Sequence, residues 1–306
     1  MDIEPKVTIV IPAFNEELAI GKTVSKIRSL YPDFQIIVVD DGSSDNTAHE
    51  ALKAGAEIIR HPYNIGNGAA VKTGIRHAKG KYVVLMDGDG QHRPEDIKEL
   101  LKYSDTYDLI VGARDAKGQA SLGRRIANWC YNKMASYVGK FPIKDLTSGF
   151  RVFKTDTVRR YLYLFPNTFS YPTTSTLAYL RSGLTIKYVP VEVEKRVGKS
   201  KISILADGSR FLLIILRIAT LYSPLRVFLP VSFVFFLIGI LYYLYTYLLY
   251  HRFTNMSALL LSVSIMVFLL GLVSEQITQM RYDRVEDTLE TKIEKLPCSK
   301  DNQRKR

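Results

Sequence analysis

The chain has 306 residues, a formal net charge of +12 and a hydrophobic content of 47%. This length suffices for one α/β domain of ordinary size plus a smaller appendage. The basic excess indicates an anionic partner, and two distant cysteines, Cys130 and Cys298, exclude a disulfide framework and a cysteine metal site. We expect no signal peptide, because the apolar run after Lys6 is too short for a signal core.

The first part of the chain alternates short apolar runs with stretches of helical length. The predicted strands are Val7–Ile11, Ile36–Val39, Glu57–Ile59, Tyr82–Met86 and Leu109–Val111. The predicted helices are Glu17–Leu30, Asp45–Ala54, Gly68–Ala78 and Pro94–Lys102, with Gly55 and Gly80 where helix C-caps are expected. This alternation predicts a mainly parallel sheet with helices on both faces and ligands beyond the carboxyl ends of the strands.

The following segments are less regular. Ala120–Gly139 has the pattern of another helix, Leu146–Phe153 that of a loop running into a strand, and Ile186–Val193 that of an extended segment. Ile202–Leu221 is apolar but contains Arg210 and Arg217. It is either an amphipathic helix in the membrane interface or a buried core helix, and periodicity does not separate the two.

Two long apolar runs follow. Val227–Tyr250 has about 24 residues without a charge, and Met256–Ile277 has about 22 with only Glu275 charged, so each is long enough to span a bilayer. The short connection His251–Asn255 predicts a hairpin. Basic residues concentrate outside the hairpin, which predicts cytoplasmic termini and a cytoplasmic N-terminal domain. They are Lys195, Arg196, Lys199, Lys201, Arg210, Arg217 and Arg226 before it and Arg281 and Arg284 after it, against Arg252 in the connection.

Polar clusters lie at the ends of predicted strands. They are Pro12–Glu17, Asp40–Asp45, Asp87–His92 and Thr147–Arg151. Asp87 and Asp89 stand at alternate positions, so their oxygens can converge on one hard cation, with Gln91 as a further oxygen ligand. Mg²⁺ or Mn²⁺ held there would neutralise a diphosphate. The alternative is a polar turn with a helix cap.

Two other segments are open to two interpretations. Asp40 and Asp41 end a predicted strand, where an acid can bond a ribose hydroxyl, or Asp41 or Asp45 caps the next helix. Asn64–Gly68 precedes a helix and can bring backbone N–H groups to a phosphate, or it is an ordinary glycine-rich turn.

The clusters together carry a resemblance. In chain order they read Pro-x-x-Asn-Glu, Asp-Asp-Gly-Ser-x-Asp, Asn-x-Gly-x-Gly, Asp-x-Asp-x-Gln-His and Thr-Ser-Gly-Phe-Arg. This set, over about Val7 to Leu225, resembles family 2 inverting glycosyltransferases, and within them the dolichyl-phosphate mannose synthases and polyprenyl-phosphate glucosyltransferases. Gly88 and Gly90 depart from the larger residues of many relatives, which leaves the metal acids intact and the donor sugar open.

The resemblance implies a GT-A fold, Rossmann-like and mainly parallel, with interfacial amphipathic helices and a transmembrane hairpin. We expect a cytoplasmic catalytic domain over residues 1–200 and an interfacial helix over 201–225. Two transmembrane helices over 226–280 and a charged cytoplasmic tail over 281–306 would follow.

The resemblance also implies roles for single residues. Pro12, Phe14, Glu16 and either Asp40 or Asp41 would hold the nucleoside. Asp87, Asp89 and Gln91 would hold Mg²⁺ or Mn²⁺ and the diphosphate, with Arg196 and Lys199 also at the donor diphosphate. Arg114, Arg124 and Asn128 would contact the acceptor phosphate.

The implied reaction is the inverting transfer of a hexose from GDP-mannose or a UDP-hexose to a dolichyl or undecaprenyl phosphate at the cytoplasmic membrane face. A phosphate acceptor is already anionic, so catalysis reduces to bringing two anions together and stabilising the departing diphosphate. His92 is then structural. Asp145 is a candidate base if the acceptor is instead an alcohol.

Two alternatives stay open at this point. The acceptor can be a hydroxyl of a glycolipid or polysaccharide, or the chain can be a non-catalytic membrane protein that only binds nucleotide or anionic lipid. Two helices are too few for a polymer channel. We expect no nucleic-acid partner, because the basic residues lie beside the apolar runs, where lipid phosphate is nearer. A homo-oligomer is compatible with the sequence.

Overall fold

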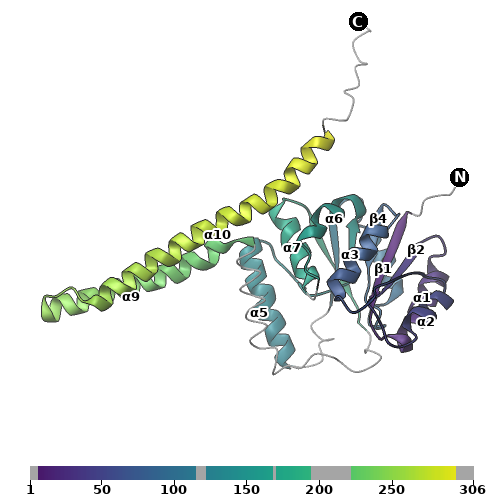
Figure 1. Ribbon diagram of the computed structural model, residues 1–306, viewed down its shortest axis with the longest axis horizontal. Coiled ribbons are helices and arrows are strands. Elements are labelled where there is room, and N and C mark those ends of the chain that lie inside the picture. The colour runs from purple at the N-terminus through teal and green to yellow at the C-terminus, as the bar shows by residue number, and fades with distance from the viewer. Residues whose placement is uncertain (1–5, 115–121, 168–169, 194–221, 294–306) are drawn as a thin grey trace, which may run out of the picture. The chain divides into compact units, whose positions relative to one another are not determined.

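The structure is a computed structural model that describes residues 6–114, 122–167, 170–193 and 222–293. The side chains of residues 122–128, 130 and 281–293 lie outside this description. The chain divides into two compact units, Met1–Ile218 and Ala219–Arg306, which are described in turn (Figure 1).

The described part of the first unit is built on a seven-stranded sheet in the order β3-β2-β1-β4-β6-β5-β7. All neighbouring strands are parallel except β6, which is antiparallel to both β4 and β5. The expected mainly parallel sheet is therefore confirmed, with one reversed strand inserted. The strands are β1 (Val7–Ala13), β2 (Gln35–Asp40), β3 (Glu57–Arg60), β4 (Tyr82–Leu85), β5 (Leu109–Arg114), β6 (Arg151–Lys154) and β7 (Ile186–Val191).

Helices connect the strands close to their predicted places. They are α1 (Glu17–Leu30), α2 (Thr47–Lys53), α3 (Asn67–His77), η1 (Pro94–Asp96), α4 (Ile97–Leu101), α5 (Leu122–Gly139), α6 (Thr155–Tyr161), η3 (Leu162–Leu164) and α7 (Tyr171–Arg181). Gly55 follows α2 with a φ of 95°, as a C-terminal glycine should. The C-cap expected at Gly80 is wrong, because α3 ends at His77 and Ala78 is its C-cap. A Cβ at Gly80 would lie 2.7 Å from the backbone of Val7 and Thr8, so this glycine permits close approach to β1.

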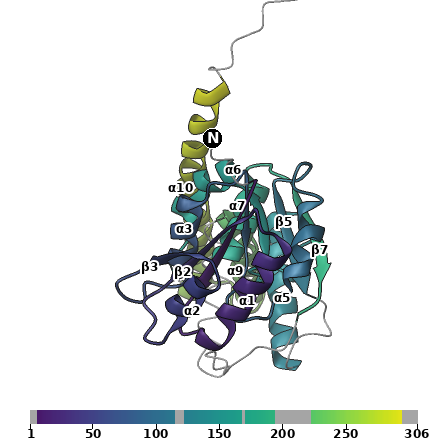
Figure 2. The ribbon, with the colours of Figure 1, turned by 90° about the vertical axis from the view of Figure 1, so that its right-hand side faces the viewer.

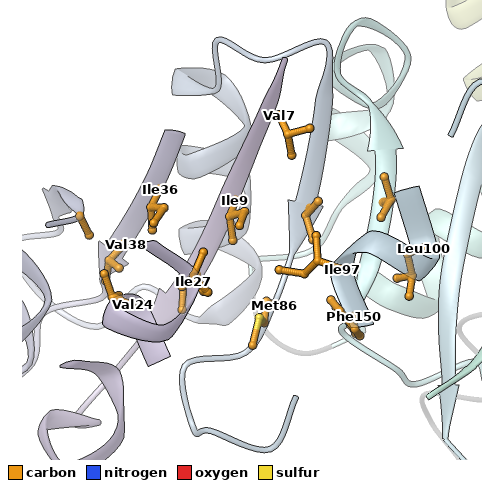
Figure 3. Packing of buried hydrophobic residues seen from close by; sticks show 14 of the residues in the cluster. Val7, Ile9, Val24, Ile27, Ile36, Val38, Met86, Ile97, Leu100 and Phe150 are labelled. Carbon is orange, nitrogen blue, oxygen red and sulfur yellow. The ribbon is translucent and has the colours of Figure 1, made fainter. Parts of the chain in front are cut away.

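Both faces of the sheet are covered, because the buried strands carry apolar residues on each side. On one face, β1 and β2 pack against Val24 and Ile27 of α1, and Ile97 and Leu100 of α4 belong to the same buried cluster (Figure 3). On the other face, Ile37 and Val39 pack against Ala70 of α3, which lies across the sheet from α1 (Figure 2). Each large apolar side chain buried in this way stabilises the fold by about 1.5–3 kcal/mol.

This topology sends four strand ends to one edge of the sheet. β1, β2 and β4 are parallel neighbours. β5 shares their direction, because β4 and β5 are both antiparallel to β6, which lies between them in the sheet. The segments that follow Ala13, Asp40, Leu85 and the end of β5 therefore start at the same edge, where open α/β sheets bind ligands.

The second unit is a helical hairpin. α9 (Pro224–Tyr250) and α10 (Asn255–Ile293) pack along each other. The segments Pro224–Tyr250 and Asn255–Met280 are long enough to cross a membrane, and their most apolar 18-residue windows have mean hydropathies of 2.4 and 2.5. Only 11% and 17% of their most apolar windows are buried, so most apolar side chains face outward, as lipid contact requires. The predicted hairpin is confirmed, although α9 begins earlier, at Pro224, and α10 continues as one helix to Ile293.

Candidate functional site

The segment after β4 folds into a turn that closes on itself. Gly90, with a φ of 76°, allows the chain to reverse, and the N–H of Gln91 donates to Asp89 Oδ1 over 3.1 Å. The N–H of Asp87 donates to Nδ1 of His92 over 3.3 Å. Hydrogen bonds within residues 87–92 thus hold the main chain of Asp87 and the carboxylate of Asp89.

His92 is buried beneath this turn and stacks on Phe150, with 5.0 Å between the ring centroids. Burial lowers the pKa of His92 to about 4, even though the charges of Asp89 and Asp145 oppose the shift. The imidazole is therefore neutral at neutral pH. Because Nδ1 accepts the Asp87 N–H, the ring proton lies on Nε2, and the expected structural role fits this geometry.

The Thr147–Arg151 segment packs directly against Asp87. A Cβ placed on Gly149 would lie 2.8 and 3.0 Å from the two carboxylate oxygens of Asp87, so only glycine leaves them this room. The buried hydroxyl of Tyr171, at the start of α7, donates to the Gly149 carbonyl over 3.4 Å. Nothing in the sequence pattern indicated that Tyr171 would reach this site.

Arg114, at the end of β5, forms a two-pronged ion pair with Asp145. Its Nε lies 2.8 Å from Asp145 Oδ2 and its Nη2 lies 3.0 Å from Oδ1. Burial alone would raise the pKa of Asp145, but the hydrogen bonds and charge of Arg114 and the N–H of Thr147 hold it below the usual value. Asp145 is thus an ionised partner of Arg114. Among the described residues, Nη1 of Arg114 makes no hydrogen bond, and the side chain keeps 29% of its surface exposed.

The loops after β1 and β2 are joined by hydrogen bonds. The N–H of Asn15 donates to Ser43 Oγ over 2.9 Å, and the N–H of Glu16 donates to Thr47 Oγ1 over 2.8 Å. Asp40 is fully buried, accepts the Ser43 N–H at Oδ1 and lies 3.1 Å from Nε of Arg60 through Oδ2. Pro12 is buried, while Phe14 and Glu16 are half-buried at this edge.

Asp41 organises the Asn64–Gly68 segment. Its carboxylate accepts the N–H groups of Ile65 and Gly66 over 3.0 and 2.8 Å and contacts Nδ1 of His61 at 2.7 Å. These two N–H groups are therefore occupied by Asp41. The interpretation that the turn offers its backbone N–H groups to a phosphate is wrong for these two groups. Sequence reasoning missed His61, although it directly follows a strand ending at the same edge.

Asp87 and Asp89 alone are too few to complete the coordination of a divalent cation, so a bound ligand must supply further oxygens. Asp87 is about one third exposed, Asp89 is buried and Gln91 is half-buried. Among the described residues no group of three or more His, Cys, Asp or Glu side chains is placed to hold a metal ion. Two carboxylates at alternate positions nevertheless fit Mg²⁺ or Mn²⁺, which take their remaining oxygen ligands from phosphates and water.

Some predicted site residues cannot be placed. The backbone of Arg124 and Asn128 belongs to α5, but their side chains lie outside the described residues. Arg196, Lys199 and the predicted interfacial segment Ile202–Leu221 lie outside them altogether. Their roles stay predictions.

Comparisons with known proteins agree with this architecture. Residues 8–162 match Glycosyl transferase family 2, and residues 223–280 match the GtrB C-terminal hairpin. The undecaprenyl-phosphate mannosyltransferase of Micrococcus luteus is 31% identical over 218 residues, covering 65% of this chain and 88% of that protein. The putative glycosyltransferase CsbB of Bacillus subtilis is 27% identical over 303 residues, covering 90% of this chain and 88% of that protein.

The fold has solved counterparts. Glucosyl-3-phosphoglycerate synthase from Mycobacterium tuberculosis, in complex with Mn²⁺ and UDP-glucose, superposes with a TM-score of 0.55 at 19% identity. The match covers 70% of this chain and 78% of that one, and it establishes the GT-A fold. With a family match that spans half of its length, this chain belongs to glycosyl transferase family 2 and is a glycosyltransferase.

Proposed function

We propose that this glycosyltransferase moves a hexose from a nucleotide-sugar to a polyprenyl phosphate at the cytoplasmic face of a membrane, with inversion and with a divalent cation. The observation that carries the proposal concerns Asp145 and His92, the two candidate bases beside the Asp87–Asp89 turn. Both are already held by hydrogen bonds within the protein. The hairpin over residues 223–280 and the likeness to an undecaprenyl-phosphate mannosyltransferase support a lipid phosphate as acceptor.

An alcohol acceptor needs a base, and both candidates are committed elsewhere. The two carboxylate oxygens of Asp145 are held by Arg114, and the pKa of Asp145 lies below its ordinary value. His92 is buried and uses Nδ1 to accept the Asp87 N–H. A phosphate acceptor is already ionised, so it reacts without either group.

The residue roles follow the arrangement at the strand ends. Asp87, Asp89 and Gln91 would hold Mg²⁺ or Mn²⁺, which when bound neutralises charge on the diphosphate. Nη1 of Arg114 offers donors to the acceptor phosphate while Asp145 fixes the rest of the guanidinium. Arg124 and Asn128 would complete the acceptor site, and Arg196 and Lys199 the diphosphate site.

The loops after β1 and β2 would hold the nucleoside through Pro12, Phe14, Glu16 and Asp40 or Asp41. Asp41 would contribute by fixing the Asn64–Gly68 turn. Asp40 is buried at the strand end, so it would act through the Ser43 loop that it holds. We keep GDP-mannose and a UDP-hexose as the donor candidates.

The proposed arrangement in the cell is a cytoplasmic catalytic domain over residues 1–200 and an interfacial helix over 201–225. A membrane hairpin over 226–280 and a cytoplasmic tail over 281–306 complete it. The basic flanks of the hairpin support this orientation. A homo-oligomer is compatible with it.

Transfer to a matched pair of acceptors tests the function. Purified full chain is incubated with UDP- and GDP-sugars and Mn²⁺, with either a polyprenyl phosphate or the corresponding polyprenol, and the lipid is analysed by mass spectrometry. We expect a mass increase of one hexose on the phosphate only. Transfer to the polyprenol alone would replace the proposal with the alcohol-acceptor alternative.

A further inference from the structure

Arg151, the first residue of β6, is a buried cation surrounded by neutral acceptors. Its side chain is fully buried, with Nε donating to the Ser148 carbonyl over 2.7 Å and Nη2 to the Leu146 carbonyl over 3.1 Å. Nη1 donates to the hydroxyls of Ser175 and Thr176 over 3.1 and 2.8 Å. In the described part of the chain, Arg151 forms no ion pair.

Such a charge is expensive to bury. Neutral oxygens satisfy the donors of a guanidinium but do not replace the solvation of its charge, which is why buried charges are normally paired. The tyrosines near Arg151 do not supply an anion, because burial raises the pKa of Tyr188 to about 12 and that of Tyr171 as well. Asp145 is already paired with Arg114. The free protein therefore holds a positive charge for which its own fold offers no direct partner.

The Arg151 guanidinium binds the segment that contacts the candidate metal site. Arg151 donates to the carbonyls of Leu146 and Ser148. The next residue is Gly149, where an added Cβ would lie 2.8 Å from the Asp87 carboxylate. The Tyr171 hydroxyl, which donates to Gly149, is influenced by the charges of both Asp87 and Arg151. The Arg151 guanidinium and the Asp87 carboxylate thus contact the same short segment, residues 146–149.

The charge balance of this cluster depends on Arg151. Three carboxylates, those of Asp87, Asp89 and Asp145, face two guanidinium groups, those of Arg114 and Arg151, so the cluster has a net charge of −1. A divalent cation would turn it to +1, which attracts an anion. Without Arg151 the same cation would leave the cluster neutral, and the attraction for a diphosphate would fall.

We propose that Arg151 is a positioning residue for the diphosphate of the donor, because its buried charge leaves the Asp87–Asp89 turn with a net positive charge once the cation is bound. It acts through the 146–150 segment and through its field, without touching the ligand. This inference rests on the proposed function, since it takes the donor to be a nucleoside diphosphate compound.

Binding, not activity, tests the proposal. Affinities of the full chain in detergent are measured by calorimetry with Mn²⁺ for UMP against UDP and for GMP against GDP. The variants are Arg151→Met and Arg151→Gln, which remove the charge, and Arg151→Lys, which keeps it. Arg159→Gln is the matched control, because Arg159 likewise donates to neutral acceptors, the main-chain carbonyls of Ile75, Arg76 and Ala78, but lies on the exposed surface.

We expect the preference for diphosphate over monophosphate to fall about tenfold in both neutral variants, as loss of one charge in a low-dielectric site predicts. Arg151→Lys should keep most of the preference and Arg159→Gln all of it. An unchanged preference in folded neutral variants overturns the proposal. Failure of both neutral variants to fold does so too, since the free protein would then need the charge itself. No diphosphate binding by the unaltered chain would instead contradict the proposed function.

Discussion

The ion pair between Asp145 and Arg114 makes the stability of the fold depend on pH, because only the ionised carboxylate pairs with the guanidinium. The folded pKa of Asp145 is depressed, so its ionised form adds stability above the unfolded pKa of about 3.9, and that contribution is lost as pH falls through the folded pKa. We expect Asp145→Asn to lose about 1–3 kcal/mol of unfolding free energy at pH 7. The difference from the unaltered protein should shrink below about pH 4.

Denaturant unfolding between pH 7 and pH 3.5 measures this difference. Asp33→Asn is the control, because Asp33 lies exposed between α1 and β2 and should matter little. A gap between Asp145→Asn and the unaltered protein that stays constant down to pH 3.5 would show that the Arg114–Asp145 pair does not shift the carboxyl pKa.

Asp89 is the residue on which the metal hypothesis depends most. Asp89→Asn keeps an oxygen to accept the Gln91 N–H but removes the charge, so the turn should persist while cation binding is lost. We expect transfer to drop about 100-fold or more, with an unchanged melting temperature. Asp156→Asn, on the exposed start of α6, is the control. Full activity of the unaltered enzyme in excess chelator would sink the metal hypothesis.

At the scale of elements, the contact between the 147–151 segment and the β4 turn sets the position of Asp87. Gly149→Ala would place a methyl group 2.8 Å from an Asp87 oxygen and 3.0 Å from the Tyr171 hydroxyl, so one of them must move. We expect Mn²⁺-dependent nucleotide affinity to fall about tenfold, because a small displacement of one ligand is enough to weaken a metal site. Calorimetric titration of UDP and GDP measures it.

Gly21→Ala provides the comparison. Gly21 lies inside α1, where an added Cβ meets only ordinary contacts at 3.6 Å and beyond, and alanine favours the helix over glycine. This variant should bind nucleotide normally and melt no lower than the unaltered protein. Equal nucleotide affinity in the two alanine variants would mean that the 147–151 segment does not control Asp87.

Ser232 of α9 and Ser264 of α10 join the two helices of the hairpin. Ser232 Oγ donates to the Ser264 carbonyl over 3.0 Å, and Ser264 Oγ donates back to the Ser232 carbonyl over 2.9 Å. Such bonds between membrane helices contribute about 0.6–2 kcal/mol. A double-mutant cycle with Ser232→Ala and Ser264→Ala, read by unfolding in mixed micelles, should therefore show coupling of that size. Strictly additive losses would mean that the two hydroxyls act independently.

Sequence patterns predicted the parallel strands and the acids at their ends, because a parallel sheet sends those ends to one edge whatever lies between them. They did not predict that β6 reverses direction, since a short apolar run reads the same in both directions. The Arg114–Asp145 pair was missed for another reason. It joins residues 31 positions apart in the sequence, and no periodicity reports such a contact.

Over the whole molecule, the distribution of charge along the chain is more informative than its sum. The net charge of +12 gathers partly at the two ends of the hairpin, while the connection between α9 and α10 carries only Arg252. Single acids near membrane segments are costly unless satisfied. Glu275 meets this condition, because its Oε2 accepts the N–H of Leu225 in the first turn of α9, where the helix dipole favours a negative charge.

This charge asymmetry makes the topology testable. Because basic flanks stay in the cytoplasm, the connection should lie outside and the C-terminus inside. In a background where Cys130 and Cys298 are replaced by serine, single cysteines are introduced as Phe253→Cys and Asn302→Cys, and intact cells are treated with a membrane-impermeant thiol reagent. Phe253 is exposed in the connection, so the reagent should label its cysteine in intact cells. It should label the cysteine at position 302 only after the cells are permeabilised. The opposite pattern would place the catalytic domain outside, away from cytoplasmic nucleotide-sugars, and would contradict the proposed site of the reaction.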